Sequence, residues 1–468
     1  MYLQHLCLPV RRPPFKALLL SAMMASGLTA NAMDLLQAFD AAQQSDASIL
    51  SARATTQAER ERLPQAKSQM LPSLNASVSS MKNQLESETP NFLGVTQTTH
   101  TDYPSTNKSV TLRQPLYRPQ LLAQYRQAQS LVDDAEAVLM QEEQNLAVRV
   151  AGAYFDALLA HEQLSLILAQ QAAYAKQLDA SKKSFAAGSG IRTDIDEAQA
   201  RLDMNLAQEI EARQNVSYTL QQLQMLVKQP IEKLAELNAS KLELLSPQPD
   251  NLQDWVTRAE ANSPQLRSLK ARVDAARQET EKAKSGHYPT IDAIVQWSDS
   301  KSESVTNTSS RYINKSYGLQ LNVPLFAGGY VNSLVRQALA SQTRAEQNLE
   351  AGRLDLSLRV YKEFRGVTEN IPKVKALEQA LRSADQMIIS SRKSFQAGSR
   401  TMLEVLNAEQ QRTVVLRDLA QARFMYLISK IRLLALVGGA DRGVVEQVNL
   451  VLATPAMPVS STPLTAKQ

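Results

Sequence analysis

The stretch SFAAGSGIRTDIDEAQARL (residues 184–202) has a near copy, SFQAGSRTMLEVLNAEQQR, at residues 394–412. In both copies the string Ser-Phe-x-Ala-Gly-Ser interrupts a long pattern that is typical of helix. Gly188 and Gly398 suit the left-handed residue with which many helices end. Each stretch therefore predicts a tight turn between two antiparallel helices.

The helices on either side of these turns are expected to be long. They are predicted at about residues 119–187, 193–228, 330–396 and 401–438. At about 1.5 Å per residue, the first and third would each reach roughly 100 Å. Thr193 and Thr401 are expected to cap the two returning helices, and Pro372 predicts a kink in the third helix.

The duplication extends beyond the turns and predicts two structural repeats. QMLPSLNASVS (residues 69–79) corresponds to GHYPTIDAIVQ (286–296), and VTLRQPLYRPQ (110–120) to LQLNVPLFAGG (319–329). Each half is expected to hold a helix, two strands, a long helix and a returning helix. The predicted boundaries are 33–250 for the first repeat, 251–440 for the second and 441–468 for a C-terminal segment with a flexible tail.

Four segments alternate apolar and polar residues, which is the pattern of a strand with one apolar face. They are predicted at about residues 71–82, 107–117, 288–298 and 312–326. The pattern fits a half-buried strand in a soluble sheet, or a membrane strand with lipid on one side and water on the other. The stretches between paired strands, 82–107 and 298–311, are rich in Ser, Thr and Asn, as extracellular loops of membrane barrels are.

Four strands are too few to close a membrane barrel, since bacterial single-chain barrels begin at about eight strands. Open sheet edges are not tolerated in lipid, because their backbone groups would lack hydrogen-bond partners. If the four strands enter a membrane, several chains must therefore each contribute four.

Residues 1–32 have the features of a signal peptide. A basic stretch ending at Lys16 precedes apolar residues 17–30, and Ala32 ends a small-residue cleavage site. The apolar stretch is shorter than the about 20 residues that span a bilayer. Cleavage would remove three of the +5 formal charges and the single cysteine, Cys7. We therefore expect neither disulfides nor a cysteine lipid anchor, and the charge gives no support for nucleic-acid binding.

Enzymatic chemistry finds no support in the sequence. The histidines beyond the predicted signal peptide are His100, His161 and His287, and they are widely scattered. The chain has no phosphate-binding glycine loop, no nucleophile elbow and no cluster with metal-ligand spacing. We therefore expect a protein that is not an enzyme and that needs neither a metal nor another cofactor.

The chain resembles the TolC family of outer-membrane channel proteins. VPLFAGGYVNSLVRQALA (residues 323–340) is similar to that family's strand running into its long helix. FQAGSRTMLEVLNAEQ (395–410) is similar to its second periplasmic hairpin, and ARFMYLISKIRLLALVG (422–438) to its final helix. The layout of the two halves, the strands and the turns matches over about residues 33–440.

The resemblance implies a homotrimer that is mainly α with membrane β. In this family a 12-stranded β-barrel, with four strands from each chain, continues into a 12-helix periplasmic α-barrel. A mixed α/β belt surrounds the middle, which here would come from roughly residues 228–255 and the C-terminal segment.

The function implied by the resemblance is that of a passive exit duct in the outer membrane of a Gram-negative bacterium. An inner-membrane pump, either ABC-type or proton-driven, and a periplasmic adaptor would deliver the substrates. Type I protein secretion and multidrug efflux both remain open. A different class also remains open, namely a periplasmic coiled-coil adaptor or structural tether without a pore.

The resemblance further implies a gate at the periplasmic end, formed by a polar network between hairpins and by rings of acids. Arg400, Asp194 and Phe395 match network positions, with Arg400 expected to reach Asp194. Phe395 stands where the family can use tyrosine, so a hydroxyl hydrogen bond would be lost. Glu404 matches a pore-facing acid, whereas Asn407 stands where a second acid is expected, which predicts weaker cation selectivity.

Simpler explanations exist for some of these residues. Thr401 and Glu404 fit a capping box, and acids such as Asp194 are favoured in a first helical turn in any case. The small residues at the tips could merely form the turns, but we expect them also to let an adaptor approach closely. These are Ala187, Gly188, Ser189, Gly190, Ala397, Gly398 and Ser399.

Overall fold

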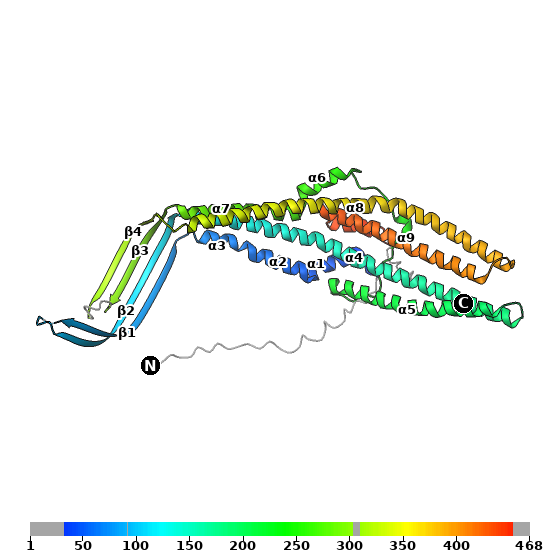
Figure 1. Cartoon of the computed structure of the whole chain (residues 1–468), viewed down its shortest axis with the longest axis horizontal. Coiled ribbons are helices and arrows are strands. Elements are labelled where there is room, and N and C mark those ends of the chain that lie inside the picture. The colour runs from blue at the N-terminus through cyan, green and yellow to red at the C-terminus, as the bar shows by residue number, and fades with distance from the viewer. Residues whose placement is uncertain (1–31, 91, 303–308, 453–468) are drawn as a thin grey trace, which may run out of the picture.

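The computed structural model describes residues 32–90, 92–302 and 309–452. Within them the chain forms a long rod, with a four-stranded sheet at one end and two helical hairpins at the other (Figure 1). The predicted signal peptide, apart from Ala32, lies outside the described residues, as do residues 453–468 of the predicted C-terminal segment.

Three short helices lead from the middle of the rod to the sheet (Figure 1). They are α1 (Leu35–Ser45), α2 (Ala47–Arg60) and α3 (Arg62–Ser68). Asp34 forms a capping box with Gln37 at the start of α1. Asp46 accepts hydrogen bonds from the backbone N–H groups of Ser48 and Ile49 at the start of α2. These caps fix where each helix begins.

The sheet is an antiparallel meander of four strands in the order β1-β2-β3-β4. The strands are β1 (Ser73–Pro90), β2 (Thr96–Tyr117), β3 (Thr290–Lys301) and β4 (Arg311–Asn322). β2 pairs with β1 as far as Pro90↔Thr96, but with β3 only as far as Thr106↔Lys301. The β1–β2 hairpin therefore extends well beyond its neighbours.

This extension replaces most of the loop that was predicted at residues 82–107. Both strands continue through it, and only a short turn remains between Pro90 and Thr96. The prediction relied on alternating apolar and polar residues and therefore missed these parts of the strands. A two-stranded ribbon with water on both faces needs no apolar face. The backbone groups are satisfied by the partner strand instead.

The sheet exposes large apolar side chains within a single chain. Leu74 is 69% exposed on β1, and Tyr317 and Leu319 on β4 are 89% and 72% exposed. Nothing else in the described chain packs on the outer edges of β1 and β4. An exposed apolar patch of this kind marks a surface that meets another molecule or a membrane.

Two helices of similar length run from the sheet to the far end of the rod (Figure 1). They are α4 (Pro119–Ala186) with 68 residues and α8 (Tyr330–Gln396) with 67 residues. Proline at the first position of α4 suits a helix start, and α8 continues as helix through Pro372. At ~1.5 Å per residue, each helix measures about 100 Å.

Shorter helices complete the rod. α5 (Arg192–Val227) and α9 (Met402–Leu436) return from the tips to its middle, and α6 (Leu252–Asn262) and α7 (Pro264–Lys284) lead back to the sheet. α10 (Arg442–Asn449) follows α9, and two 3₁₀ turns, η1 (Ala239–Lys241) and η2 (Ser285–His287), lie in the connections. No helix in the described part of the chain is both long and apolar enough to cross a membrane.

The main core lies in the middle of the rod, where both halves meet. Tyr154 and Phe155 on α4 and Tyr426 on α9 are almost fully buried there. The Tyr154 hydroxyl lies 3.0 Å from the carbonyl oxygens of Met33 and Ala235. An isolated β-bridge between Met33 and Leu234 lies beside this hydroxyl. The residues just before α1 and the segment after α5 are therefore held against the core.

An ionic cluster joins the sheet to α4. Asp292 on β3, whose side chain is 3% exposed, accepts hydrogen bonds from Arg113 at 2.6 Å and from Arg118 at 2.6 and 2.8 Å. Arg113 belongs to β2, and Arg118 lies between β2 and α4. Two arginines on one buried carboxylate leave it fully paired, which fixes the direction in which α4 leaves the sheet.

Candidate functional site

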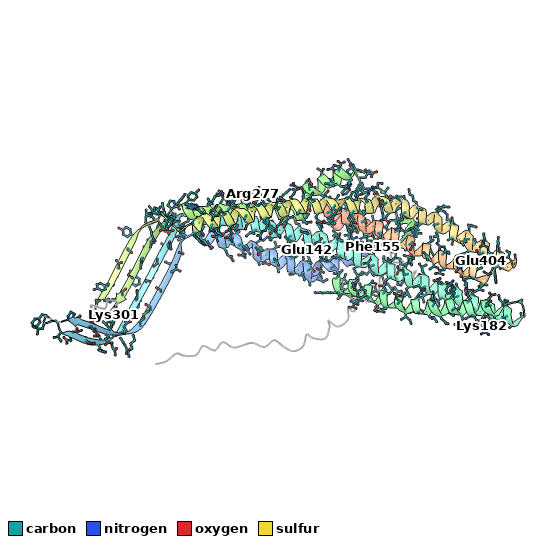
Figure 2. All side chains as sticks on the ribbon, viewed as in Figure 1. Glu142, Phe155, Lys182, Arg277, Lys301 and Glu404 are labelled. Atoms are coloured by element: carbon teal, nitrogen blue, oxygen red, sulfur yellow. The ribbon has the colours of Figure 1, made fainter. Side chains whose placement is uncertain are left out.

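The two helical hairpins end side by side at the far end of the rod, where Lys182 and Glu404 mark the first and second tip (Figure 2). Their turns share one backbone geometry. Gly188 has φ 74° and Gly398 has φ 73°. The next residue, Ser189 or Ser399, donates its N–H to the carbonyl of Ser184 or Ser394 at 3.0 or 2.9 Å. These bonds close the helix ends.

The starts of the returning helices differ. Thr401 precedes α9, and the Glu404 carboxylate accepts from the Thr401 N–H and hydroxyl, each at 3.3 Å. The corresponding residue before α5 is Ile191, which offers no cap. The prediction that Thr193 caps α5 was wrong, because the turn fixes the cap three residues after its glycine. Thr193 already lies inside the helix.

Arg400 makes two contacts, both within its own hairpin. Its Nε lies 3.3 Å from Glu404 Oε2, and its Nη1 donates to the Oγ of Ser391, a fully buried residue of α8, at 3.1 Å. Glu404 thus takes part in the capping box of α9 and also has a positively charged partner, Arg400. An arginine that spans the turn in this way ties the start of α9 to the end of α8.

Asp194 stands at the position of α5 that Glu404 occupies in α9, the third residue of the helix. Among the described residues, no side chain forms a hydrogen bond or ion pair with its carboxylate. Arg400 and Asp194 are therefore not joined within one chain. Their pairing stays a prediction, and it would have to form between neighbouring chains.

Phe395 packs in a small apolar cluster near the tips. The cluster contains Tyr174 of α4 and Met402, Val405 and Leu406 of α9, with Leu202 and Phe395 against it. Its members come from both hairpins, so it joins them near the tips. The aromatic ring of Phe395 contributes area to this contact, which a tyrosine hydroxyl would not improve.

The small residues of both tips lie at the surface. Ala187, Gly188, Ser189, Ala397, Gly398 and Ser399 are exposed, and Gly190 is half-buried. A Cβ atom would have no neighbour within 4 Å at Gly188 or Gly398, whereas at Gly190 it would lie 2.8 Å from the Phe185 nitrogen. Gly190 is thus required by the turn itself, and the other tip residues leave open surface.

Asn407 contacts a residue that the sequence analysis did not single out. Arg201 on α5 donates from Nη2 to Asn407 Oδ1 at 2.9 Å and from Nη1 to Gln410 Oε1 at 2.7 Å. These residues are separated by 206 and 209 positions in the chain. No local pattern could have found this contact, because it depends on how the two hairpins pack.

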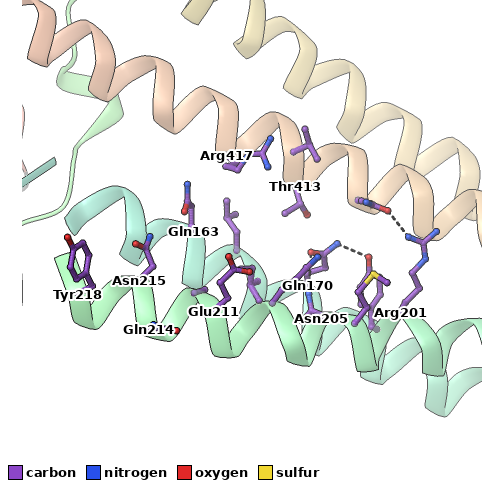
Figure 3. A pocket seen from close by; sticks show the side chains of 18 residues that line it. Gln163, Gln170, Arg201, Asn205, Glu211, Gln214, Asn215, Tyr218, Thr413 and Arg417 are labelled. Atoms are coloured by element: carbon purple, nitrogen blue, oxygen red, sulfur yellow. Dashed lines mark hydrogen bonds between the residues drawn. The ribbon is translucent and has the colours of Figure 1, made fainter. Parts of the chain in front are cut away.

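Behind this contact, on the side away from the tips, the hairpins border a cavity of about 640 Å³ that is open to solvent (Figure 3). Its lining is rich in amides, including Gln163, Gln170, Asn205 and Asn215. Burial raises the pKa of the Tyr174 hydroxyl, although the hydrogen bond from Gln170 at 2.7 Å partly opposes this. Tyr174 therefore stays neutral here.

The described part of the chain holds no group of three or more metal-binding side chains. The tips, the apolar cluster between them and the charged residues around Glu404 are the features that the sequence marked for function.

Comparison with known proteins identifies the class. The family model described as "Outer membrane efflux protein" matches residues 38–227 and 255–439. Solved channel structures share the fold: one of CusC has a TM-score of 0.74 at 18% identity, covering 90% of this chain and 96% of that chain. VceC from Vibrio cholerae has a TM-score of 0.73 at 17% identity, covering 86% and 96%.

Curated relatives are closer in sequence. The alkaline protease secretion protein AprF of Pseudomonas aeruginosa is 34% identical over 74% of this chain and 72% of that protein. The proteases secretion protein PrtF of Dickeya chrysanthemi is 31% identical over 88% and 90%. The outer membrane protein TolC of Escherichia coli is 27% identical over 93% and 89%.

The chain is thus an outer-membrane channel of the secretion and efflux class. It belongs to the outer membrane efflux protein family, which confirms the resemblance to TolC. The relatives are transport channels rather than enzymes. The alternative of an adaptor or tether without a pore receives no support.

Proposed function

We propose that three copies of this chain form one duct through the outer membrane and the periplasm. Each would add four strands to a 12-stranded barrel, with residues 33–250 and 251–440 acting as repeats that also build a 12-helix tunnel. The main support is the sheet: among the described residues the outer edges of β1 and β4 have no partner strand, and large apolar side chains of the sheet are exposed. Lipid does not tolerate open edges, so neighbouring copies must pair them.

The duct would stand in the outer membrane of a Gram-negative bacterium, after export and cleavage of the signal peptide. The ~100 Å helices would carry the tunnel through the periplasm. A periplasmic adaptor would dock on the exposed small residues of the tips, and an inner-membrane pump would supply the transport energy.

The names of the most similar of these relatives favour protein as the cargo of this duct. AprF and PrtF are named for the secretion of proteases, and they are more similar to this chain than TolC is. We infer that an ABC-type pump passes an unfolded protein into this duct. Efflux, including that of drugs, is the second candidate, which the name of the family and of the relative BepC of Brucella suis, an outer membrane efflux protein, supports.

The periplasmic end would act as a gate. The Asp194 carboxylate has no partner among the described residues of its own chain and lies at the tip, as Arg400 does, so an ion pair between neighbouring chains would close the mouth. Exposed pairs contribute only about 0–1 kcal/mol each, so three of them could hold the mouth while a docked partner could still break them. Glu404 would supply one ring of three carboxylates.

Single-channel recording in planar bilayers tests both duct and gate. We expect the purified protein to form stable channels that widen with Arg400→Ala. Glu404→Gln should reduce cation preference while it keeps the capping box, since glutamine also fits that motif. Thr401→Ala is the matched control, because it removes the cap and leaves the charge. Folded trimers that never conduct would refute the duct.

Secretion by cells tests the cargo. The strain would lack its own channel of this family and would carry the pump and adaptor for a secreted protease. Release of the protease that depends on this chain supports protein secretion. Restored drug resistance without protease release would favour efflux instead.

A further inference from the structure

Arg201 links the two hairpins of one chain. Its guanidinium group donates from one nitrogen to Gln410 Oε1 at 2.7 Å, a bond drawn in Figure 3, and from another to Asn407 Oδ1 at 2.9 Å. Arg201 lies on α5 and both acceptors lie on α9. The planar fork of arginine can serve two acceptors in fixed directions, which a lysine ammonium cannot do equally well.

These two bonds have no counterpart elsewhere between the hairpins. Throughout the described chain, the other side-chain hydrogen bonds and ion pairs of these helices do not connect α4 or α5 with α8 or α9. Gln171 bonds to Glu209 within the first hairpin, and Arg392 and Arg412 bond to Glu409 and Asp385 within the second. Among the described residues, the direct side-chain hydrogen bonds between these helices of the two hairpins therefore come from Arg201.

The surroundings of Arg201 show why a connection matters at this level. On the side of the tips lies the apolar cluster that contains Tyr174, Leu202 and Phe395. On the other side the hairpins separate around the cavity of about 640 Å³. Arg201 lines the end of this cavity that is nearer to the tips (Figure 3). It therefore lies where the hairpins, which also meet in the core, come into contact again towards the tips.

The charge of Arg201 is not neutralised by a carboxylate. Both of its acceptors are neutral amides, and it forms no ion pair with any described residue. Arg213, on the same helix, is different, because it lies 2.7 Å from Glu209 on its own helix. That contact holds the pKa of the Glu209 carboxyl below its usual range.

We infer that Arg201 is a positioning residue of the gate with two effects. It fastens the two hairpins of a chain to each other at the level of Asn407 and so limits their separation there. It also adds one uncompensated positive charge per chain at the level of Asn407. The inference rests on the proposed duct and assigns Arg201 a role in the mechanics and the ion preference of its entrance.

The two hydrogen bonds from Arg201 to Asn407 and Gln410 are called the clamp below. Two variants change the charge at this level equally but affect the clamp differently. Arg201→Gln and Asn407→Asp each make every chain one unit more negative at this level. Arg201→Gln removes the fork, whereas Asn407→Asp replaces a neutral acceptor by a carboxylate, so that the hydrogen bond becomes an ion pair and is strengthened. Arg213→Gln is the matched control, since it removes an arginine of α5 that does not contact α9.

Ion preference is read from reversal potentials in a salt gradient. We expect Arg201→Gln and Asn407→Asp each to raise the ratio of cation to anion permeability roughly twofold, because fixed charge in a narrow entrance sets the local ion concentration. Arg213→Gln should leave the ratio unchanged. If both variants behave like the control, the charge role is overturned.

The clamp is read from the distance between spin labels at Ala187→Cys and Ala397→Cys. Labelled chains are diluted with unlabelled ones, so that a trimer holds one labelled pair. We expect Arg201→Gln to broaden this distance distribution and Asn407→Asp to leave it as narrow as in the parent. An unchanged distribution in Arg201→Gln would overturn the clamp. This readout does not need conduction, so it decides the clamp even if the duct proposal fails.

Discussion

The two hairpin tips share a backbone and differ in the side chains that follow it. Both turns place a glycine at φ near 74° and close on a serine carbonyl. Thereafter the second tip has Arg400 and the Thr401 cap where the first has Gly190 and Ile191. The shared phrase therefore specifies the turn, and the two residues after it decide whether the acid beyond is paired.

The acids at equivalent positions show what this difference does. Glu404 receives the Thr401 N–H and hydroxyl and the Arg400 guanidinium within its own chain. Asp194 has none of these partners, although it lies at the same place in its helix. A duplicated turn has thus produced one satisfied acid and one that is available to a neighbouring molecule.

The largest predicted difference between the tips concerns their aromatic residues. Phe395 packs in the apolar cluster, whereas the equivalent Phe185 is 45% exposed. We expect Phe395→Ala to destabilise the second tip by about 2 kcal/mol, below the range for a fully buried ring, because Phe395 is only partly buried. Phe185→Ala should have an effect of less than ~1 kcal/mol.

Hydrogen exchange of the tip amides measures this difference, because it reports local opening rather than unfolding of the whole assembly. The comparison of the two aromatics breaks down if both alanine variants accelerate exchange to the same extent. That result would mean that the cluster does not stabilise the second tip.

A smaller and equal effect is expected at the two glycines. At Gly188 and Gly398 an added Cβ would meet open space, so only the left-handed backbone opposes a side chain. Alanine at either position should destabilise its turn by roughly 1–2 kcal/mol. Exchange of the serine N–H groups that close the two turns would show it. Clearly unequal effects would show that the two turns are not the same structure.

The caps should respond in opposite directions. Thr401→Ala removes the cap of α9 and should destabilise its first turn by about 1 kcal/mol. Ile191→Thr supplies the missing cap of α5, and Ile191 is 61% exposed, so little packing is lost. We expect ~0.5–1 kcal/mol of stabilisation. Hydrogen exchange of the backbone amides in the first turn of each helix measures both effects. Slower exchange in the first turn of α9 in Thr401→Ala would contradict the capping box.

The smallest effect is expected at Arg192. It forms an exposed ion pair with Asp196 one helical turn away, at 3.1 Å. Such pairs contribute roughly 0.2–0.5 kcal/mol, so Arg192→Ala should hardly alter exchange and should leave conductance unchanged. A change in conductance as large as that of Arg400→Ala would show that Arg192 also belongs to the gate.

Helix boundaries were accessible to sequence reasoning because they depend on local signals. The helix predicted at about residues 119–187 is α4, Pro119–Ala186, and the turn glycines stand where the phrase placed them. Thr193 failed as a cap because the position of a cap is set by the turn, which left Ile191 there. The outer half of the β1–β2 hairpin was missed since its residues are polar on both faces.

The site was accessible only in part. The capping box of Thr401 and Glu404 follows from residues three apart, and the structure contains it. The partner of Arg400 within the chain is Glu404 rather than Asp194, because a contact one turn away along a helix forms within the same hairpin. Asn407 was noted as a missing acid, but the arginine that contacts it could not be inferred.

The sequence by itself determined the helices, the turns and the strands near the rod, because spacing and turn chemistry act over a few residues. It also carried a resemblance to a channel family, which the comparison with known proteins confirmed. Only the tertiary structure decided which side chains meet across the hairpins. Arg201 and Asn407 lie 206 residues apart and face each other only when α5 and α9 pack in one particular rotation. That rotation results from all the contacts of the core and of the tip cluster, and no short stretch of sequence encodes it.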